Sequence, residues 1–431
     1  MRKNYFFTLL MLCAFVGQSQ TITTVAGNGN SGFSGDGGLA TTARLNLPFN
    51  LTFDKSDNLY IADTYNKSIR KIDTESGIIT TVVGTADRNE ISELNTPTGL
   101  TFDNFNNLFI ADIASSRIRK VNLDTGSSMT LVGKKTETEH PNIDAELGGP
   151  FNVVFDKIGH LYISNNEDSK VSKIDFFTGE VTIIAGTGIS GFSGDGGSAS
   201  QAQLANPTGL ALDNNGHLFI ADSGNERIRQ VDLATGVIST IAGNGRTGSS
   251  EDGIFAVNAR LSNPLGLAVD IVGDLYFVDR NNNKIRKIDM ATGKLYTVAG
   301  TGKQGFSGDG SLATEAKLSN PTGLAFNNAG DLFVVDRGNN RIRRITGLID
   351  NADANTVVNV KIYPNPSTDK INVEVAKNVQ LNSVALFDSS GNQVKVQLIN
   401  NSMNVARLPR GLYVLKITTS EGSSEQKVVL E

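Results

Sequence analysis

Six related segments of about fifty residues follow one another along most of this 431-residue chain. The two most similar copies run from Pro207 to Gly243 and from Pro264 to Gly300. All six begin at prolines, which lie 49, 53, 57, 57 and 57 residues apart: Pro48, Pro97, Pro150, Pro207, Pro264 and Pro321. A regular period of this length indicates a fold assembled from one repeated supersecondary unit.

Each segment contains four short runs of β-branched and aromatic residues, separated by clusters of Asp, Asn and Gly. Such runs and turn residues are typical of antiparallel hairpins, so each unit is predicted to have four strands. Four-stranded units in a series of six are typical of β-propeller blades. We therefore predict an all-β, six-bladed propeller.

The two ends of the repeat region complement each other. The sixth segment stops at Thr346 without a fourth run, whereas Ile22 to Gly27 form a fourth run with no segment before it. Pairing of these two pieces would complete the last blade and leave no open sheet edge. The sequence thus predicts a ring over residues 21–346 that is closed by its N-terminal strand, rather than a linear solenoid.

The run LFIADSGNERIRQVD, from Leu218 to Asp232, and its five counterparts resemble NHL repeats. The resemblance covers residues 21–346 and implies the propeller fold. It does not specify a function, because propellers of this kind include enzymes, adhesion modules and scaffold proteins.

Residues 1–20 have the features of a secretory signal peptide: basic Arg2 and Lys3, an apolar run from Phe6 to Gly17, and a small residue at Ser19. The one cysteine, Cys13, lies in this segment. Without the two basic residues the net charge of −5 becomes −5 − 2 = −7, which disfavours nucleic-acid binding. No other long apolar run occurs, so we expect no transmembrane segment in the mature chain.

Residues 347–359 are polar and are predicted to be a linker, and the alternating pattern of 360–431 predicts a small β-sandwich. Four motifs in this last segment resemble the type A sorting domain of type IX secretion. Their residues are Tyr363, Pro364, Asn365 and Pro366; Gly391; Leu408, Gly411 and Tyr413; and Lys427. The resemblance implies a Bacteroidota source, the type IX machinery as partner, and passage through the periplasm to the medium or the outer cell surface.

No set of residues has the pattern of a catalytic centre. The histidines His140, His160 and His217 have no zinc-ligand spacing. Six-bladed lactonases bind calcium through Asn and Asp just after the start of the first strand, a position occupied here by Phe49, Thr98, Phe151, Thr208, Leu265 and Thr322. We expect no metal and no cofactor, and we assign no catalytic residue. A lactonase-like or lyase-like enzyme that uses the axial channel remains an alternative, as does a structural scaffold.

Charged residues recur at two strand positions. The second run ends in Asp63, Asp112, Asn165, Asp222, Asp279 and Asp336, and the third run carries Arg70, Arg119, Ser172, Arg229, Arg286 and Arg343. The aspartate recurs wherever the turn after the second run recurs, which favours hydrogen bonds between its side chain and that turn. We expect the charged residues to form solvated or structural ion pairs rather than a ligand site.

Glycine-rich loops with the sequence FSGDG precede the first, fourth and sixth segments, and a drifted copy precedes the fifth. We expect the connecting loops on one face of the ring near its axis. Function on propellers concentrates in such loops. The candidate ligand-binding residues are Phe33, Asp36, Phe49, Asn50, Phe151, Asn152, Phe192, Asp195, Phe306 and Asp309. Residues of the first three segments depart from the repeat pattern, which favours a ligand-binding site over these segments. We predict a monomer that binds an extracellular protein or glycan on this face.

Overall fold

The computed structural model describes residues 20–84, 94–123, 127–133, 143–156, 158–176, 178–348, 361–363, 366–375, 379–387, 393–399, 401–419 and 422–430. The chain divides into two compact units between Leu348 and Ile349. The predicted signal peptide, except for Gln20, and residues 349–359 of the predicted linker lie outside the described residues. Within the described residues, no helix is long and apolar enough to cross a bilayer.

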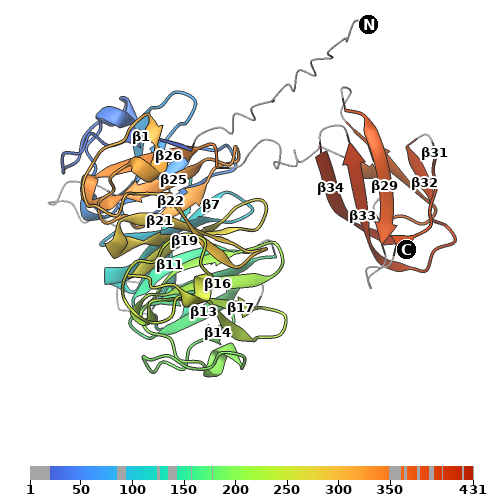
Figure 1. The fold of residues 1–431 in the computed structure, drawn as a ribbon, viewed down its shortest axis with the longest axis horizontal. Helices are drawn as coiled ribbons and strands as arrows, with labels where there is room; N and C mark the ends of the chain where they lie inside the picture. Colours follow the sequence, from blue (N-terminus) through green and yellow to red (C-terminus); the bar gives the residue numbers. More distant parts are fainter. Residues whose placement is uncertain are drawn as a thin grey trace, which may run out of the picture. The chain divides into compact units, whose positions relative to one another are not determined.

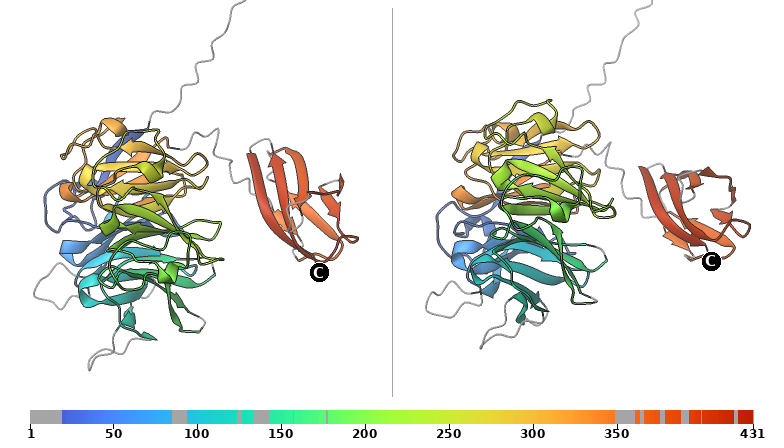
Figure 2. Two further views of the ribbon diagram at one scale, coloured as in Figure 1. Left: turned by 60° about the horizontal axis from the view of Figure 1, so that its bottom comes forward. Right: turned by 90° about the horizontal axis from the view of Figure 1, so that it is seen from below.

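The first unit contains six antiparallel sheets among the described residues (Figures 1 and 2). Blade 1 comprises β2 (Leu51–Phe53), β3 (Leu59–Asp63), β4 (Ser68–Ile72) and β5 (Ile79–Gly84). Blade 2 comprises β6 (Pro97–Phe102), β7 (Asn107–Asp112), β8 (Arg117–Asn122) and β9 (Ser128–Gly133), with β10 (Ile143–Asp144) parallel to β9. Blade 3 comprises β11 (Pro150–Phe155), β12 (His160–Asn165), β13 (Lys170–Asp175) and β14 (Val181–Ala185).

The remaining three blades have the same order. Blade 4 comprises β15 (Pro207–Leu212), β16 (His217–Asp222), β17 (Arg227–Asp232) and β18 (Ile238–Ala242). Blade 5 comprises β19 (Pro264–Val269), β20 (Leu275–Asp279), β21 (Lys284–Asp289) and β22 (Lys294–Ala299). Blade 6 comprises β24 (Leu324–Phe326), β25 (Leu332–Asp336), β26 (Arg341–Thr346) and β1 (Thr21–Ala26), with β23 (Ser311–Leu312) paired to β1.

The blades form a closed ring. Each first strand contacts the first strand of the next blade, and β24 of blade 6 contacts β2 of blade 1. Apolar clusters fill every interface between neighbouring blades; at the closing interface, Val335 and Ile342 pack with Leu51 and Ile61. The predicted six-bladed propeller is therefore confirmed.

Strand β1 completes blade 6, as the split repeat predicts. It pairs antiparallel with β26 in the register Thr21–Thr346 to Thr24–Arg343, and Figure 1 shows the two strands side by side. The hydroxyl groups of Thr21 and Thr346 lie 2.9 Å apart within hydrogen-bonding distance, and Ile22 is fully buried. The first and last strands of the unit thus share one sheet.

Glycine is required at two positions where the first strands of adjacent blades meet, in blades 4 and 5. A Cβ atom on Gly209 would lie 2.1 Å from the carbonyl oxygen of Leu265, and one on Gly266 would lie 2.5 Å from that of Thr322. Contacts this short are not tolerated, so the glycine that follows the repeat proline by two residues permits the close approach of the inner strands.

Blades that meet at the axis diverge outward, and short 3-10 helices fill the space between their outer halves. These are η1 (Ala40–Thr42), η4 (Ala199–Gln201), η6 (Ala256–Asn258) and η8 (Ala313–Glu315). In the loop between blades 3 and 4, Ala199, Ala202 and Leu204 are buried among residues of both blades. The repeated Ala-x-x-Ala-x-Leu pattern therefore has a packing role.

The second unit is the predicted β-sandwich. One sheet contains β27 (Lys361–Tyr363), β28 (Lys370–Glu374), β32 (Ser402–Asn404) and β31 (Leu398–Ile399). The other contains β30 (Gln393–Val394), β29 (Leu381–Phe387), β33 (Gly411–Thr419) and β34 (Gly422–Leu430). Ile371 and Met403 from the first sheet and Leu386 and Leu415 from the second share one apolar core.

Deletion of residues 21–27 should lower the free energy of unfolding by at least about 4 kcal/mol. The deletion removes several backbone hydrogen bonds, each contributing about 1 kcal/mol, and the buried side chain of Ile22. Chemical denaturation followed by circular dichroism measures the change. The control Ile22→Val should lose only about 1 kcal/mol. An unchanged denaturation midpoint for the deletion would contradict closure by β1.

Candidate functional site

Four blades each contain a fully buried arginine on the third strand: Arg70, Arg229, Arg286 and Arg343. Each guanidinium group lies between a buried aspartate at the end of the second strand and a loop aspartate. The shortest N···O distances from Arg70 are 3.3 Å to Asp63 and 2.7 Å to Asp36, and those from Arg229 are 3.3 Å to Asp222 and 2.7 Å to Asp195. Arg286 lies 3.8 Å from Asp279 and 3.1 Å from Asp252, and Arg343 lies 3.4 Å from Asp336 and 2.7 Å from Asp309. These are structural ion pairs, in which the arginine and the strand aspartate are fully buried and the loop aspartate is 39–47% exposed.

The strand aspartates are enclosed by hydrogen-bond donors. The Asp63 carboxylate accepts hydrogen bonds from the Asn46 backbone N–H, the Asn66 side-chain amide and Arg70. Burial raises the pKa of this carboxyl group to about 6 although its donors favour the charged form. Burial has the same effect at Asp279 and Asp336. All three pKa values lie below neutral pH, so the charged pairs persist there.

The loop phenylalanines cover these arginines. Phe192 lies with its ring centroid 3.7 Å from the Cζ atom of Arg227 and 4.9 Å from that of Arg229. Phe306 has the same distances to Arg341 and Arg343, and Phe33 lies 4.5 Å from Arg70. The three residues are 36–42% exposed. Each ring therefore packs against a cation and also contacts solvent.

The glycine-rich loops run along the outer strand of the following blade. The backbone N–H groups of Gly37, Gly196 and Gly253 donate to carbonyl oxygens at or next to the start of the fourth strands: Ile79, Ile238 and Leu295. This path differs from the expected position near the axis, because the loop fills the space between diverging blades. Phe33, Asp36, Phe192, Asp195, Phe306 and Asp309 consequently lie over the outer half of the ring.

Around the axis, the structure brings together a different set of residues. Phe49 and Phe151 come from blades 1 and 3, and their rings meet edge to face with centroids 5.1 Å apart. Both pack against the apolar cluster that contains Leu265. These three residues, each directly after the blade proline of its segment, thus lie together around the axis, and the aromatic pair forms the floor of a cavity.

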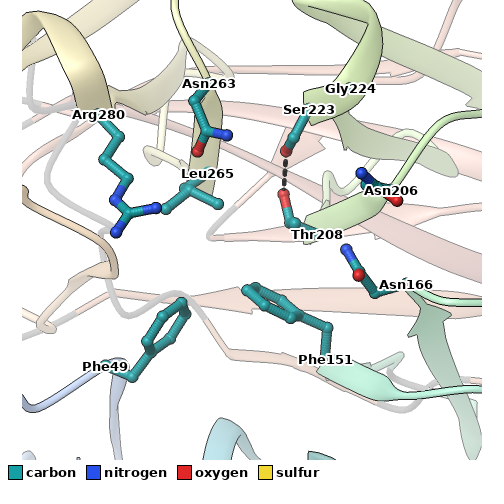
Figure 3. Close-up of a pocket in the computed structure, with 10 residues that line it drawn as sticks. All are labelled: Phe49, Phe151, Asn166, Asn206, Thr208, Ser223, Gly224, Asn263, Leu265 and Arg280. Carbon is teal, nitrogen blue, oxygen red and sulfur yellow. Dashed lines mark hydrogen bonds between the residues drawn. The ribbon is translucent and has the colours of Figure 1, made fainter.

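This cavity has a volume of about 230 Å³. Its polar lining comes mainly from blades 3, 4 and 5, beyond the first three segments favoured by the sequence: Asn166, Asn206, Thr208, Ser223, Asn263 and Arg280. Figure 3 shows these side chains around one space with the two phenylalanine rings. Thr208 and Ser223 are hydrogen-bonded to each other, whereas no hydrogen-bond donor reaches the buried Asn263 Oδ1 within the described part of the chain.

Asn50 and Asn152 are not among the residues lining this cavity. Both are buried, and each Oδ1 accepts a hydrogen bond from the backbone N–H of the next residue, Leu51 or Val153. A Cβ atom on Gly323 would lie 2.5 Å from Asn50 Oδ1. These amides therefore belong to the packed contacts between inner strands.

Three cavity residues that the sequence did not reveal, Asn166, Ser223 and Arg280, occupy one repeat position, directly after the second strand. In blade order this position holds Thr64, Ile113, Asn166, Ser223, Arg280 and Arg337. It opens the 3-10 turns η2 (Thr64–Asn66), η3 (Ile113–Ser115), η5 (Ser223–Asn225), η7 (Arg280–Asn282) and η9 (Arg337–Asn339). Its chemical diversity, next to the recurrent aspartate, is the signal that could have identified it.

The histidines that the structure describes have local roles. His160 Nδ1 lies 2.8 Å from Asp156 Oδ2, and His217 Nδ1 lies 2.7 Å from Asp213 Oδ2, both in turns between the first and second strands. His140 lies outside the described residues. Over the ranges that the structure covers, no group of three or more His, Cys, Asp or Glu side chains could hold a metal.

The sorting-motif residues lie in the β-sandwich. The hydroxyl group of Tyr413 donates to the carbonyl oxygen of Pro409 at 2.8 Å, and Leu408 packs against the sandwich core. Gly411 begins β33 with φ +145°, a conformation that favours glycine. Tyr363 and Pro366 are exposed, and Lys427 pairs with Val414 in the backbone register of β34. Pro364, Asn365 and Gly391 lie outside the described residues.

Comparison with protein families agrees with both units. A model described as the Teneurin NHL domain matches residues 20–190 and 150–251, and the NHL repeat model matches residues 318–345. The chain belongs to the NHL-repeat family. Residues 361–431 match the secretion system C-terminal sorting domain, which indicates export to the cell surface or the medium by type IX secretion.

Curated relatives share the NHL propeller within longer chains. The chain is 29% identical over 334 residues to protein SUPPRESSOR OF QUENCHING 1, chloroplastic, of Arabidopsis thaliana. The alignment covers 75% of this chain and 27% of the plant protein. The chain is 28% identical over 314 residues to NHL repeat-containing protein 2 of Bos taurus, which covers 66% of this chain and 37% of that protein. The chain therefore spans only about a third of the length of these relatives.

Solved structures support the NHL propeller fold. A Bacteroides thetaiotaomicron protein of unknown function superposes with a TM-score of 0.59 at 16% identity, and the match covers 76% of each chain. An auxiliary nutrient binding protein from the same species superposes with a TM-score of 0.56 at 20% identity, again over 76% of each chain. At these identities the similarity establishes the fold alone.

Removal of one buried charge should destabilise the NHL propeller strongly. Arg229→Ser leaves the buried Asp222 carboxylate without its cation, which should cost about 3–5 kcal/mol of unfolding free energy. The double variant D222N/R229S reproduces the neutral Asn165–Ser172 pair of blade 3 and should lose less than R229S. Chemical denaturation measures both. The exposed control Arg246→Ser should change stability by less than about 0.5 kcal/mol. Equal losses in the single and double variants would contradict this role.

Proposed function

We propose that this chain is a secreted binding protein that recognises an extracellular saccharide in the axial cavity of its propeller. The observation that carries the proposal is the cavity itself, which combines an aromatic floor with amide and hydroxyl groups. Sugars are bound through stacking on aromatic faces and hydrogen bonds to hydroxyl groups, and concave sites with a few polar groups are the usual ligand sites of proteins.

The cavity volume limits the size of what enters it. About 230 Å³ is smaller than the roughly 300–1,000 Å³ of sites for drug-sized ligands. The cavity thus accommodates one end of a ligand, with the remainder outside. A terminal sugar residue of a longer saccharide matches this requirement.

The surrounding blades keep the site rigid. Ser223 donates a hydrogen bond to the carbonyl oxygen of Pro264 in the next blade, and Thr322 donates to that of Phe49 at 2.6 Å. Such cross-blade bonds hold the lining groups in place before a ligand arrives, which reduces the entropic cost of binding.

The exported location and one structural relative agree with a binding role. The C-terminal sorting domain directs the chain to the outside of the cell, where extracellular saccharides are encountered. A relative with the same propeller fold is described as an auxiliary nutrient binding protein. We extend the idea of ligand binding, not the identity of that relative's nutrient, to this chain.

A saccharide-binding assay tests the proposal. The mature chain, residues 21–431, is screened on a panel of immobilised neutral and acidic oligosaccharides, and affinities are measured by titration calorimetry. Asn166→Ala should weaken binding about fivefold, because one hydrogen bond contributes about 1 kcal/mol. The control Asn30→Ala, on an exposed loop residue outside the cavity lining, should bind like the wild type. Failure to bind any saccharide would contradict the proposed function.

The sorting domain generates a separate prediction about export. Removal of residues 360–431 should leave the propeller folded but retained in the periplasm, because the export signal is lost while the ring is intact. Fractionation of cells and medium, with protease resistance as the test of folding, measures the outcome. Normal amounts of the truncated protein outside the cell would refute the assignment of this segment as the signal.

A further inference from the structure

Two neighbouring blades place arginines at the axis. Arg280 opens η7 in blade 5 and Arg337 opens η9 in blade 6, whereas the same position in the other four blades is uncharged. Arg280 lines the cavity. Burial lowers the pKa of Arg280, and the positive charge of Arg337 in the neighbouring blade lowers it further.

These cations differ from the buried arginines of the blade interfaces. Arg70, Arg229, Arg286 and Arg343 each pair with two aspartates. In contrast, no carboxylate lies within ion-pair distance of Arg280 or Arg337 among the described residues. The chain carries a net charge of −5, so this local excess of positive charge does not reflect a basic protein.

Aromatic rings hold Arg337 beside the cavity. Its Cζ atom lies 5.7 Å from the ring centroid of Phe49 and 5.8 Å from that of Tyr65. Phe49 in turn packs against Phe151 on the cavity floor. Tyr65 is 58% exposed. Arg280 therefore lines a small space that also offers aromatic surface and neutral polar groups, and Arg337 lies beside this space against Phe49 and Tyr65.

We propose that the cavity binds the acidic terminal residue of a saccharide, with Arg280 and Arg337 as the groups that recognise its carboxylate or sulfate. This inference rests on the proposed function and specifies its ligand class. An oxyanion would relieve the repulsion between the two arginines and accept charge-assisted hydrogen bonds from their planar groups. The amides of Asn166 and Asn263 would then face sugar hydroxyls, which an acidic peptide end does not provide in comparable number.

Titration calorimetry on the mature chain provides the test. The probes are trigalacturonate, its fully methyl-esterified counterpart, a sulfated oligosaccharide of similar length, and a short oligoglutamate peptide. We expect an acidic saccharide to bind at least tenfold more tightly than the neutral ester. The carboxylate and sulfate probes share the proposed chemistry, and the tighter of the two identifies the natural oxyanion.

Variants locate the charge recognition. Arg280→Gln and Arg337→Gln should each weaken binding of the acidic saccharide at least tenfold and leave binding of the ester within about twofold. Arg280→Lys retains the charge and should bind more tightly than Arg280→Gln. The matched control is Arg246→Gln, an exposed arginine outside the cavity, which should bind like the wild type. Melting temperatures equal to that of the wild type show that the variants are folded. If a glutamine variant unfolds, the affinities of Arg280→Lys and the wild type for the acidic saccharide are compared instead.

The outcomes separate this inference from the proposed function. Equal affinity for the acid and the ester, or no effect of the arginine variants, would overturn the acidic-ligand inference but leave saccharide binding intact. Tighter binding of oligoglutamate than of any saccharide would overturn it in favour of a protein ligand. Absence of all saccharide binding would overturn both.

Discussion

Sheets arranged around one axis must touch at their inner strands and separate at their outer strands. This constraint accounts for most of the residues that repeat in the chain. At the inner strands, Gly209 and Gly266 allow neighbouring backbones to approach within distances that no side chain permits. At the outer strands, the space between blades is filled by the loop alanines and leucine, such as Ala199, Ala202 and Leu204. Ring closure by β1 then fixes all six interfaces at once.

The buried arginines also stabilise the packing between blades, because each one binds the aspartate of the loop that fills the space beside its blade. Blades 2 and 3, whose preceding loops lack the FSGDG motif and its aspartate, use other hydrogen bonds at this place. Arg119 of blade 2 donates to the hydroxyl groups of Thr130 and Ser128. In blade 3 both charges are replaced, and Asn165 donates to Ser172 at 2.8 Å. In blade 3 the strand arginine and the strand aspartate are thus replaced together, which leaves no unpaired buried ion at this position.

The sequence was informative wherever the same residue recurred. Recurrence predicted the blades, their number and the closing strand, whereas the alternating pattern of residues 360–431 predicted the sandwich. Phe49, Phe151 and Leu265, which occupy the same repeat position, lie together at the axis. The course of the glycine-rich loops was not predicted, because it depends on contacts between a loop and a strand about forty residues later, as between Gly37 and Ile79. Arg280, Arg337 and Tyr65 were also missed, because a search for repeated residues overlooks a position where each blade differs.

That last omission has a physical explanation. The position after the second strand lies in a short turn at the axis, and the neighbouring strand aspartate already supplies the hydrogen bonds that hold the turn in place, as Asp279 does for Ser262 and Asn282. The side chain that follows is thus free of any structural requirement that all blades share. Three of these positions, held by Asn166, Ser223 and Arg280, line the axial cavity, so the chemistry of the cavity depends on residues that differ from blade to blade. In a symmetric fold, the departure from symmetry at this position is therefore where ligand specificity is expected.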